Sequence, residues 1–321
     1  MGATHLNAYS KIPGVQIAAV CSDNPLTRSG DFTKVRGHRP GHAILRDFSA
    51  VRKYQDWRVL AQDPEIDILD ICLPTDLHAP IALAALEAGK HVLCEKPMAL
   101  SGEDCDRMIA AALKHDRILM IGQVLRFWPE YEYLRDFATS GAYGRIRSAT
   151  FIRRCGVPDW SRWLPDPSRS GGAVLDLLSH DVDRALEMFG LPQRVAAKSI
   201  AGPDAMMATL IYPGGPEVRI QGGWFAPGTP LSMSFQVRAD RAELDWTPTG
   251  LMLSDHTGQR KQVDISSTDA YDAELSYFVD CCRTGSQPAR CPPQASALAV
   301  KVALLIRESK AAGGRQLQGA F

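Results

Sequence analysis

Short apolar segments alternate with helix-forming segments along the first third of this 321-residue chain. Each apolar segment is only a few residues long, which is typical of strands buried on both faces of a sheet. Because parallel strands need crossover connections, the alternation predicts a doubly wound parallel α/β sheet. The expected strands are residues 15–21, 66–73, 91–94 and 118–122, and the expected helices are residues 79–88 and 101–115.

The segment between residues 24 and 50 departs from this alternation. Gly30, Gly37, Pro40 and Gly41 interrupt any helix there. We therefore predict a long irregular connection.

After about residue 122 the pattern changes to a run of strands, which predicts a second domain of α+β type with an antiparallel meander. Turn sequences such as residues 213–215 separate the strands. The expected strands are residues 146–154, 194–200, 205–212, 217–224, 232–238 and 242–247. The expected helices are residues 129–139, 172–189, 270–284 and 296–312.

The composition is that of an ordinary globular protein and carries no charge bias. Hydrophobic residues make up 45% of the chain, and 36 basic residues balance 36 acidic ones, so neither nucleic acid nor a membrane is an expected partner. No apolar run approaches the roughly 20 residues of a membrane helix, and no signal peptide is recognised. The eight scattered cysteines fit a reduced, cytoplasmic protein.

Glu95-Lys96-Pro97 directly follows the expected strand at residues 91–94. Open α/β sheets bind ligands in the crevice outside the carboxyl ends of their strands, so a lysine at this place is aimed at a ligand site. Pro97 also restricts Lys96 to an extended conformation. The alternative is a solvated turn lysine.

Residues 73–78 follow the strand at residues 66–73 and lead into the next helix. Backbone amides and the Thr75 hydroxyl at such a helix start suit the phosphates or ribose of a cofactor. The alternative is ordinary N-capping by Thr75 or Asp76.

Asp176 and His180 are four residues apart, so on the expected helix they share one face. Histidine is the usual general acid or base near neutrality, and a carboxylate partner orients it. The alternative is two polar positions on a half-exposed helix. Only Asp183 is available nearby as a further ligand, so we predict no metal site.

Residues 73–78, 89–97 and 171–183 together resemble the glucose–fructose oxidoreductase/inositol dehydrogenase (Gfo/Idh/MocA) family, over almost the whole chain. The resemblance implies a Rossmann dinucleotide-binding domain in residues 1–122. It also implies an α+β domain with an open, mainly antiparallel sheet in residues 123–321, which binds substrate and forms homodimers or homotetramers. The implied reaction is hydride transfer between NAD(P) and a hydroxyl carbon of a sugar, cyclitol or polyol.

The resemblance also implies roles for individual residues. The implied catalytic residues are Lys96, Asp176 and His180. The implied cofactor-binding residues are Gly2, Ala3, Asp23, Leu73, Pro74, Thr75, His78, Glu95 and Lys96. The implied substrate-binding residues are Arg126, Trp163, Asp176 and His180. For the tryptophan, packing between the domains is the alternative.

The chain departs from the family at its start. A Rossmann domain opens with a strand followed by G-x-G-x-x-G, but residues 1–9 match only the last glycine and the helix behind it. The missing strand is central, so we expect two neighbouring strands to lack ladder partners. A misassigned start codon, an artificially shortened chain and a lesion in the gene would each explain this, and the intact remainder favours the first.

The sequence leaves alternatives open for the cofactor and for the activity. Asp23 could bind the ribose of NAD, although Ser22 holds the position where an acid is expected; NAD is favoured over NADP. The alternatives to a dehydrogenase are a non-catalytic relative with impaired dinucleotide binding and an NAD-dependent enzyme that cleaves glycosidic bonds.

Overall fold

The strands of the first 122 residues pair in parallel, as predicted. The structure is a computed structural model that describes residues 1–35 and 44–319. The strands of this part are β1 (Ala19–Cys21), β2 (Arg52–Tyr54), β3 (Ile68–Ile71), β4 (His91–Glu95) and β5 (Leu119–Gly122). The helices are α1 (Gly2–Tyr9), α2 (Pro25–Ser29), α3 (Trp57–Ala61), η1 (Thr75–Leu77), α4 (His78–Glu87), α5 (Gly102–Lys114) and η2 (Val124–Arg126).

In the described residues, these strands form two separate parallel sheets, β1–β2 and β3–β4–β5. The expectation that two strands lack ladder partners is therefore confirmed, since β1 and β3 are each paired on one side only. Helix α1 lies between the two pieces. Ala3 packs near Val20 in one cluster, while a Cβ placed on Gly2 would lie 3.8 Å from the Cβ of Cys72.

The connection after β1 is more regular than predicted. Asn24 accepts a hydrogen bond from the amide of Leu26 and caps α2, which has Pro25 in its first turn. Gly30 ends this helix with φ 94°, so it is a C-cap rather than an interruption. Gly37, Pro40 and Gly41 lie outside the described residues.

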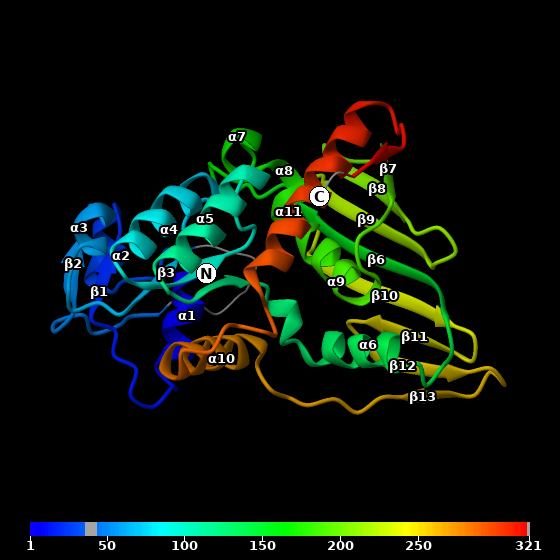
Figure 1. Cartoon of the computed structure of the whole chain (residues 1–321), viewed down its shortest axis with the longest axis horizontal. Helices are drawn as coiled ribbons and strands as arrows, with labels where there is room; N and C mark the ends of the chain where they lie inside the picture. Colours follow the sequence, from blue (N-terminus) through cyan, green and yellow to red (C-terminus); the bar gives the residue numbers. More distant parts are fainter. Residues whose placement is uncertain (36–43, 320–321) are drawn as a thin grey trace.

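The C-terminal part is built on a large mixed sheet, ordered β13-β12-β11-β10-β6-β9-β8-β7-β14 (Figure 1). The strands are β6 (Ile146–Gly156), β7 (Arg194–Ser199), β8 (Asp204–Ile211), β9 (Glu217–Phe225), β10 (Ser232–Ala239), β11 (Ala242–Thr247), β12 (Gly250–Asp255), β13 (Arg260–Gln262) and β14 (Leu317–Gln318). The prediction of a simple meander is wrong. Strand β6 inserts between β9 and β10 and runs parallel to β9. Phe151 at its centre is fully buried, so this long strand is the middle of the core.

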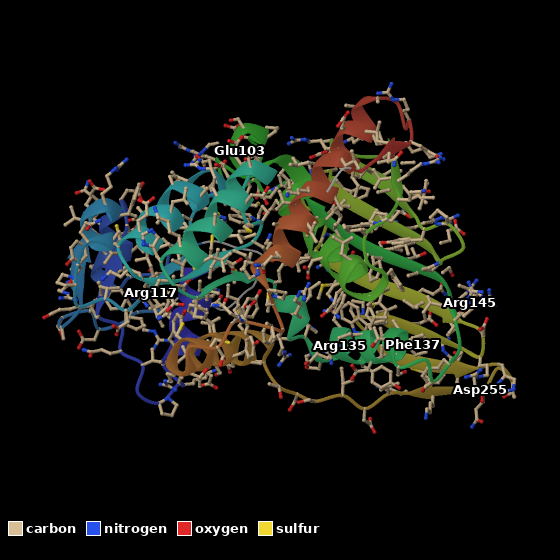
Figure 2. All side chains as sticks on the ribbon, viewed as in Figure 1. Glu103, Arg117, Arg135, Phe137, Arg145 and Asp255 are labelled. Atoms are coloured by element: carbon tan, nitrogen blue, oxygen red, sulfur yellow. The ribbon has the colours of Figure 1, made fainter. Side chains whose placement is uncertain are left out.

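Helices cover one face of the large sheet, between it and the N-terminal domain (Figure 1). The helices that contact this sheet are α6 (Pro129–Thr139), α8 (Gly172–Asp176), α9 (Ser179–Phe189) and α11 (Pro293–Ala311). The other two helices of this part are α7 (Pro167–Ser170), which contacts α8 and η1, and α10 (Ala270–Thr284). Phe137 of α6, labelled in Figure 2, is one of the buried side chains beneath the sheet. Helix α10 instead packs against α1 in the N-terminal domain.

The predicted helix at residues 172–189 is interrupted. The amides of Leu177 and Leu178 both donate to the carbonyl of Ala173, at 2.9 and 3.0 Å, and a new helix begins at Ser179. The break lets two consecutive leucines be buried in different places, because Leu177 joins a small cluster around Trp224 and Leu178 joins the main core.

Candidate active site

Lys96 lies one residue past the carboxyl end of β4 and reaches into the C-terminal domain. Its Nζ donates to the main-chain carbonyl of Asp176 and to Oδ1 of the same residue, at 3.2 Å for Oδ1. Asp176 is the last residue of α8, so this contact joins the two domains. The Lys96 and Asp176 side chains are 17% and 12% exposed. Lys96 is thus held by a carboxylate at the sheet edge rather than being a solvated turn residue.

Two consecutive glycines start α8 and so place Asp176. Gly171 and Gly172 have φ values of 79° and 76°, in the left-handed region that L side chains rarely adopt. A Cβ on Gly171 would lie 2.2 Å from Cδ1 of Leu175. The glycine pair of this motif therefore has a structural reason, since only glycine permits the turn that brings Asp176 to Lys96.

His180 lies at the start of α9, beyond the helix break. The expected shared face of Asp176 and His180 is therefore not formed by one helix, and the described residues show Asp176 paired with Lys96 instead. The Nδ1 of His180 is buried and has no hydrogen-bond partner among the described residues. Burial lowers the pKa of His180 well below its ordinary value of 6.5, and the charges of Lys96 and Arg153 lower it further. His180 is thus neutral at pH 7.

Arg153, which the sequence analysis did not single out, holds the start of α9 in place. Its guanidinium makes two hydrogen bonds to the carboxylate of Asp181, at 2.8 and 2.9 Å, and Nη2 also lies 3.2 Å from the hydroxyl of Tyr131. Asp181 is next to His180 in the sequence. The signal was available, because Arg153 continues the inward-facing alternation of Ala149 and Phe151, where a charged residue is unusual.

Arg126, expected to bind substrate, is part of a buried structural ion pair. Its Nε and Nη2 donate to the two carboxylate oxygens of Asp183, both at 2.8 Å. Its Nη1 donates to Glu187 and to the carbonyl of Arg290. These partners use all the nitrogens of the guanidinium, so Arg126 links η2 to α9 instead of facing a substrate.

Trp163 lies on the loop between β6 and α7. It is partly buried and packs against the cluster of Cys155, Leu164, Ala173, Leu177 and Trp224. All of these residues belong to the C-terminal domain, so Trp163 packs within that domain and not between the two domains.

The turn after β3 has one atom that suits a ligand and one residue that does not. The Thr75 hydroxyl is buried and without a hydrogen-bond partner among the described residues. The two ring nitrogens of His78 lie 2.8 Å from the carbonyls of Leu73 and Pro97. His78 therefore ties this turn to the segment after Lys96, and neither nitrogen is left for a cofactor.

Glu95, the last residue of β4, is fully engaged within the protein. Its Oε1 lies 3.1 Å from Nε2 of His5, and its Oε2 accepts the amide proton of Lys96 at 3.0 Å. The expected contact of Glu95 with a nicotinamide ribose would have to compete with these bonds. His5 was not singled out from the sequence, although a histidine one turn behind Gly2 could have been examined as a second polar residue of the fingerprint helix.

The residues expected around a dinucleotide fit that group in part. Gly2 and Ala3 form the first turn of α1, where free amides attract phosphate, and Asp23 is exposed just after β1. With the unpartnered Thr75 hydroxyl, they lie at the carboxyl ends of β1 and β3, where a cofactor is expected. Among the described residues, no helix has the length and apolar character needed to cross a membrane.

Sequence comparison assigns both parts of the chain to one family. Residues 1–123 match the oxidoreductase family described as having an NAD-binding Rossmann fold, and residues 131–245 match the GFO/IDH/MocA C-terminal domain. The chain belongs to the Gfo/Idh/MocA oxidoreductase family. The resemblance and the fold class predicted from the sequence are thereby confirmed.

Characterised members of this Gfo/Idh/MocA family resemble the chain over about half of their length. Levoglucosan dehydrogenase of Pseudarthrobacter phenanthrenivorans is 33% identical over 56% of this chain and 44% of its own. D-glucoside 3-dehydrogenase of Escherichia coli is 29% identical over 61% of this chain and 52% of its own. A solved levoglucosan dehydrogenase, in complex with NADH and levoglucosan, has a TM-score of 0.84 over 100% of this chain and 97% of that one. At 21% identity this likeness shows the fold.

Proposed function

We propose that this chain is an NAD-dependent dehydrogenase that transfers a hydride between nicotinamide and a hydroxyl carbon of a sugar, cyclitol or polyol. The observation that carries the proposal is the contact of Lys96 with Asp176 across the two domains, beside a neutral His180. The sugar dehydrogenases among the relatives support the substrate class. The experiment is to follow NADH formation with a panel of sugars and polyols, and no turnover of any of them would contradict the proposal.

Each of the three residues has a chemical role in this proposal. Neutral His180 accepts the proton of the substrate hydroxyl at a ring nitrogen. The Lys96 ammonium donates a hydrogen bond to the same oxygen and stabilises the negative charge that develops on it. Asp176 accepts a hydrogen bond from Lys96 and so fixes the direction of the ammonium. NAD, when bound, supplies the hydride acceptor; Asp23, Thr75 and the amides of the first turn of α1 would hold it.

The pH dependence of sugar oxidation should report the low pKa of His180. A general base must be neutral, so kcat/KM is expected to fall only when the pH drops below the lowered pKa, which lies well under 6.5. The acid limb should therefore be displaced toward lower pH than for an ordinary histidine. His180→Asn should abolish this limb and lower kcat by about 10²- to 10⁴-fold. Steady-state rates from pH 4.5 to 9 measure both effects, and an unchanged limb in the variant would rule His180 out as the base.

The preference for NAD depends on Asp23. Its carboxylate is expected to accept hydrogen bonds from the ribose hydroxyls of NAD and to repel the 2′-phosphate of NADP. Asp23→Asn should therefore raise the KM for NAD by about tenfold, the worth of one charged hydrogen bond, and leave or lower the KM for NADP. Initial rates with both cofactors test this. An equal change in both KM values would show that Asp23 does not select the cofactor.

One observation favours a second candidate, a non-catalytic relative that binds dinucleotide poorly. The parallel sheet of the described residues is split between β1 and β3, beside the expected cofactor position. Titration of NADH against the intrinsic tryptophan fluorescence separates the two candidates. Saturable binding together with turnover supports the dehydrogenase, and absence of both supports the second candidate.

We also propose that the protein forms a homodimer or homotetramer through the large sheet. The helices α6, α9 and α11 cover one face of this sheet only (Figure 1). The opposite face carries half-exposed side chains such as Thr150 and Gln221. Light scattering of the purified protein tests this proposal, which requires a mass of two or four chains.

A further inference from the structure

His5 belongs to a buried network that the proposed reaction does not use. Its imidazole is 1% exposed and lies between two carboxylates. Nδ1 is 2.8 Å from Oδ2 of Asp70 on β3, and Nε2 is 3.1 Å from Oε1 of Glu95 on β4. A neutral imidazole carries one N–H and could donate to only one of the carboxylates, whereas an imidazolium donates to both.

The charges around His5 favour the imidazolium. Burial by itself would lower the pKa of His5, but the charge of Asp70 and the hydrogen bonds of Nδ1 with Asp70 and Cys72 raise it well above its ordinary value. Burial would likewise raise the pKa of Glu95, yet the bond to His5 and the charge of Lys96 lower it. The two shifts agree with each other. The proton between the two groups stays on His5, so that His5 is an imidazolium and Glu95 is a carboxylate.

Several further ionisable groups lie near His5. Burial raises the pKa of the Cys72 thiol to about 11. Burial and the charge of Glu95 raise the pKa of Glu274 on α10, whose two oxygens have no hydrogen-bond partner among the described residues. Tyr9 and Tyr271 also face this network, as does the Met1 amino group on the side of Cys72 and Glu95.

The ligand atoms of His5, Asp70 and Cys72 lie within 4.8 Å of one another. In the structure these groups bond to each other, because Nδ1 of His5 lies 2.8 Å from the Asp70 carboxylate and 3.3 Å from Sγ of Cys72. The arrangement is that of an ion pair in which one cation lies between two anions.

We propose that His5 is a positioning residue for Lys96, acting through Glu95. The imidazolium holds one oxygen of Glu95, and the other oxygen accepts the amide proton of Lys96 at 3.0 Å. This fixes the main chain from which the Lys96 ammonium reaches Asp176. Asp70 anchors the far side of the ring. The role rests on the proposed function, because it matters to turnover only if Lys96 is catalytic.

Two conservative variants separate this role from a general effect on stability. His5→Gln can place an amide N–H near the position of Nε2 and so keep the bond to Glu95. His5→Asn can place its amide near Nδ1 and so keep the bond to Asp70 instead. We expect His5→Gln to retain kcat within threefold of the wild type, and His5→Asn to lose at least tenfold in kcat, with KM for the sugar changed less than threefold in both. Equal losses of kcat in the two variants would overturn the proposal.

A second measurement needs neither cofactor nor substrate. Nitrogen-15 spectra of the histidine rings report whether each imidazole carries one proton or two. We expect His5 to be an imidazolium at pH 7 and to remain so above pH 8, because its pKa is raised well above the ordinary value of 6.5. A neutral His5 at pH 7 would overturn the proposal whether or not the protein is active. If His5 is charged but the protein turns over no sugar, the ion pair is present and the proposed function is rejected instead.

Discussion

Replacing Lys96 by methionine is expected to lower kcat/KM for the sugar substrate by about 10³-fold, the upper range for loss of one preorganised donor to a developing oxyanion. Methionine keeps much of the aliphatic chain and removes the ammonium, so the substrate oxygen and Asp176 both lose a partner. Because both side chains retain some contact with solvent, the melting temperature should fall by no more than about 5 °C. NADH absorbance measures the rate, and calorimetry measures the melting temperature.

Lys11→Met is the matched control for this substitution. Lys11 is also paired with a carboxylate, that of Asp272, but its side chain is 52% exposed. The Lys11→Met variant should retain kcat/KM within about twofold of the wild-type value, because exposed ion pairs contribute little to stability. If Lys96→Met kept more than a tenth of the wild-type kcat/KM, Lys96 would not have the role proposed for it.

Asp181→Ala is expected to destabilise the protein by about 3–5 kcal/mol, because it leaves the Arg153 guanidinium buried without a counter-charge. The Arg153 side chain is 5% exposed, so water cannot replace the lost carboxylate. Urea unfolding, followed by tryptophan fluorescence, measures the change in the free energy of unfolding. Since Asp181 adjoins His180, kcat should fall as well when the start of α9 loosens.

Two further variants test whether the buried charge is the cause. In the double variant Arg153→Met/Asp181→Leu both charges are removed, and most of the lost stability should return. Asp136→Ala removes the partner of Arg135, labelled in Figure 2, from a surface pair in which Asp136 is 66% exposed, and should cost less than about 1 kcal/mol. A double variant as unstable as Asp181→Ala would show that the packing around these residues, rather than the unpaired charge, decides stability.

The elements with strong local signals were predicted to the residue. Helices α6 and α10 and strand β11 have the predicted bounds. Ser101 caps α5, its hydroxyl oxygen accepting a hydrogen bond from the amide of Asp104 at 3.1 Å. Such features depend on residues within one or two turns of each other, and a single sequence contains all of that information.

The errors concern contacts between distant residues. The insertion of β6 between β9 and β10 joins segments about 70 residues apart for β9 and about 80 to 90 for β10, and nothing in the local sequence indicates it. The same holds for Arg126, whose partner Asp183 is 57 positions away. Strands β2, β13 and β14 were also missed, because each has only two or three residues. Strand β12 was missed although its buried residues Leu251 and Leu253 alternate with partly exposed ones.

For the candidate site, the contact in the structure differs from the contact that the sequence predicted. Oδ1 of Asp176 lies 3.2 Å from Nζ of Lys96, whereas the prediction paired this carboxylate with His180. The helix break at Leu177 and Leu178 is responsible, because it removes the i,i+4 relation on which the prediction depended. That break arises from the burial of two leucines in two clusters, which is a property of the tertiary structure.

The packing of α10 against α1 has a consequence for how the protein is made. Leu93 and Met120, on the parallel sheet, are covered together with Tyr9 by a cluster that includes Leu275 and Phe278 of α10. The N-terminal domain therefore cannot complete its core on the ribosome until nearly nine-tenths of the chain has been synthesised. During that time an apolar face of the nascent domain stays uncovered. We therefore expect either a chaperone to bind this face or α10 to dock on it late in synthesis. The N-terminal domain thus completes its folding only after α10 has been synthesised, although its strands come first in the sequence.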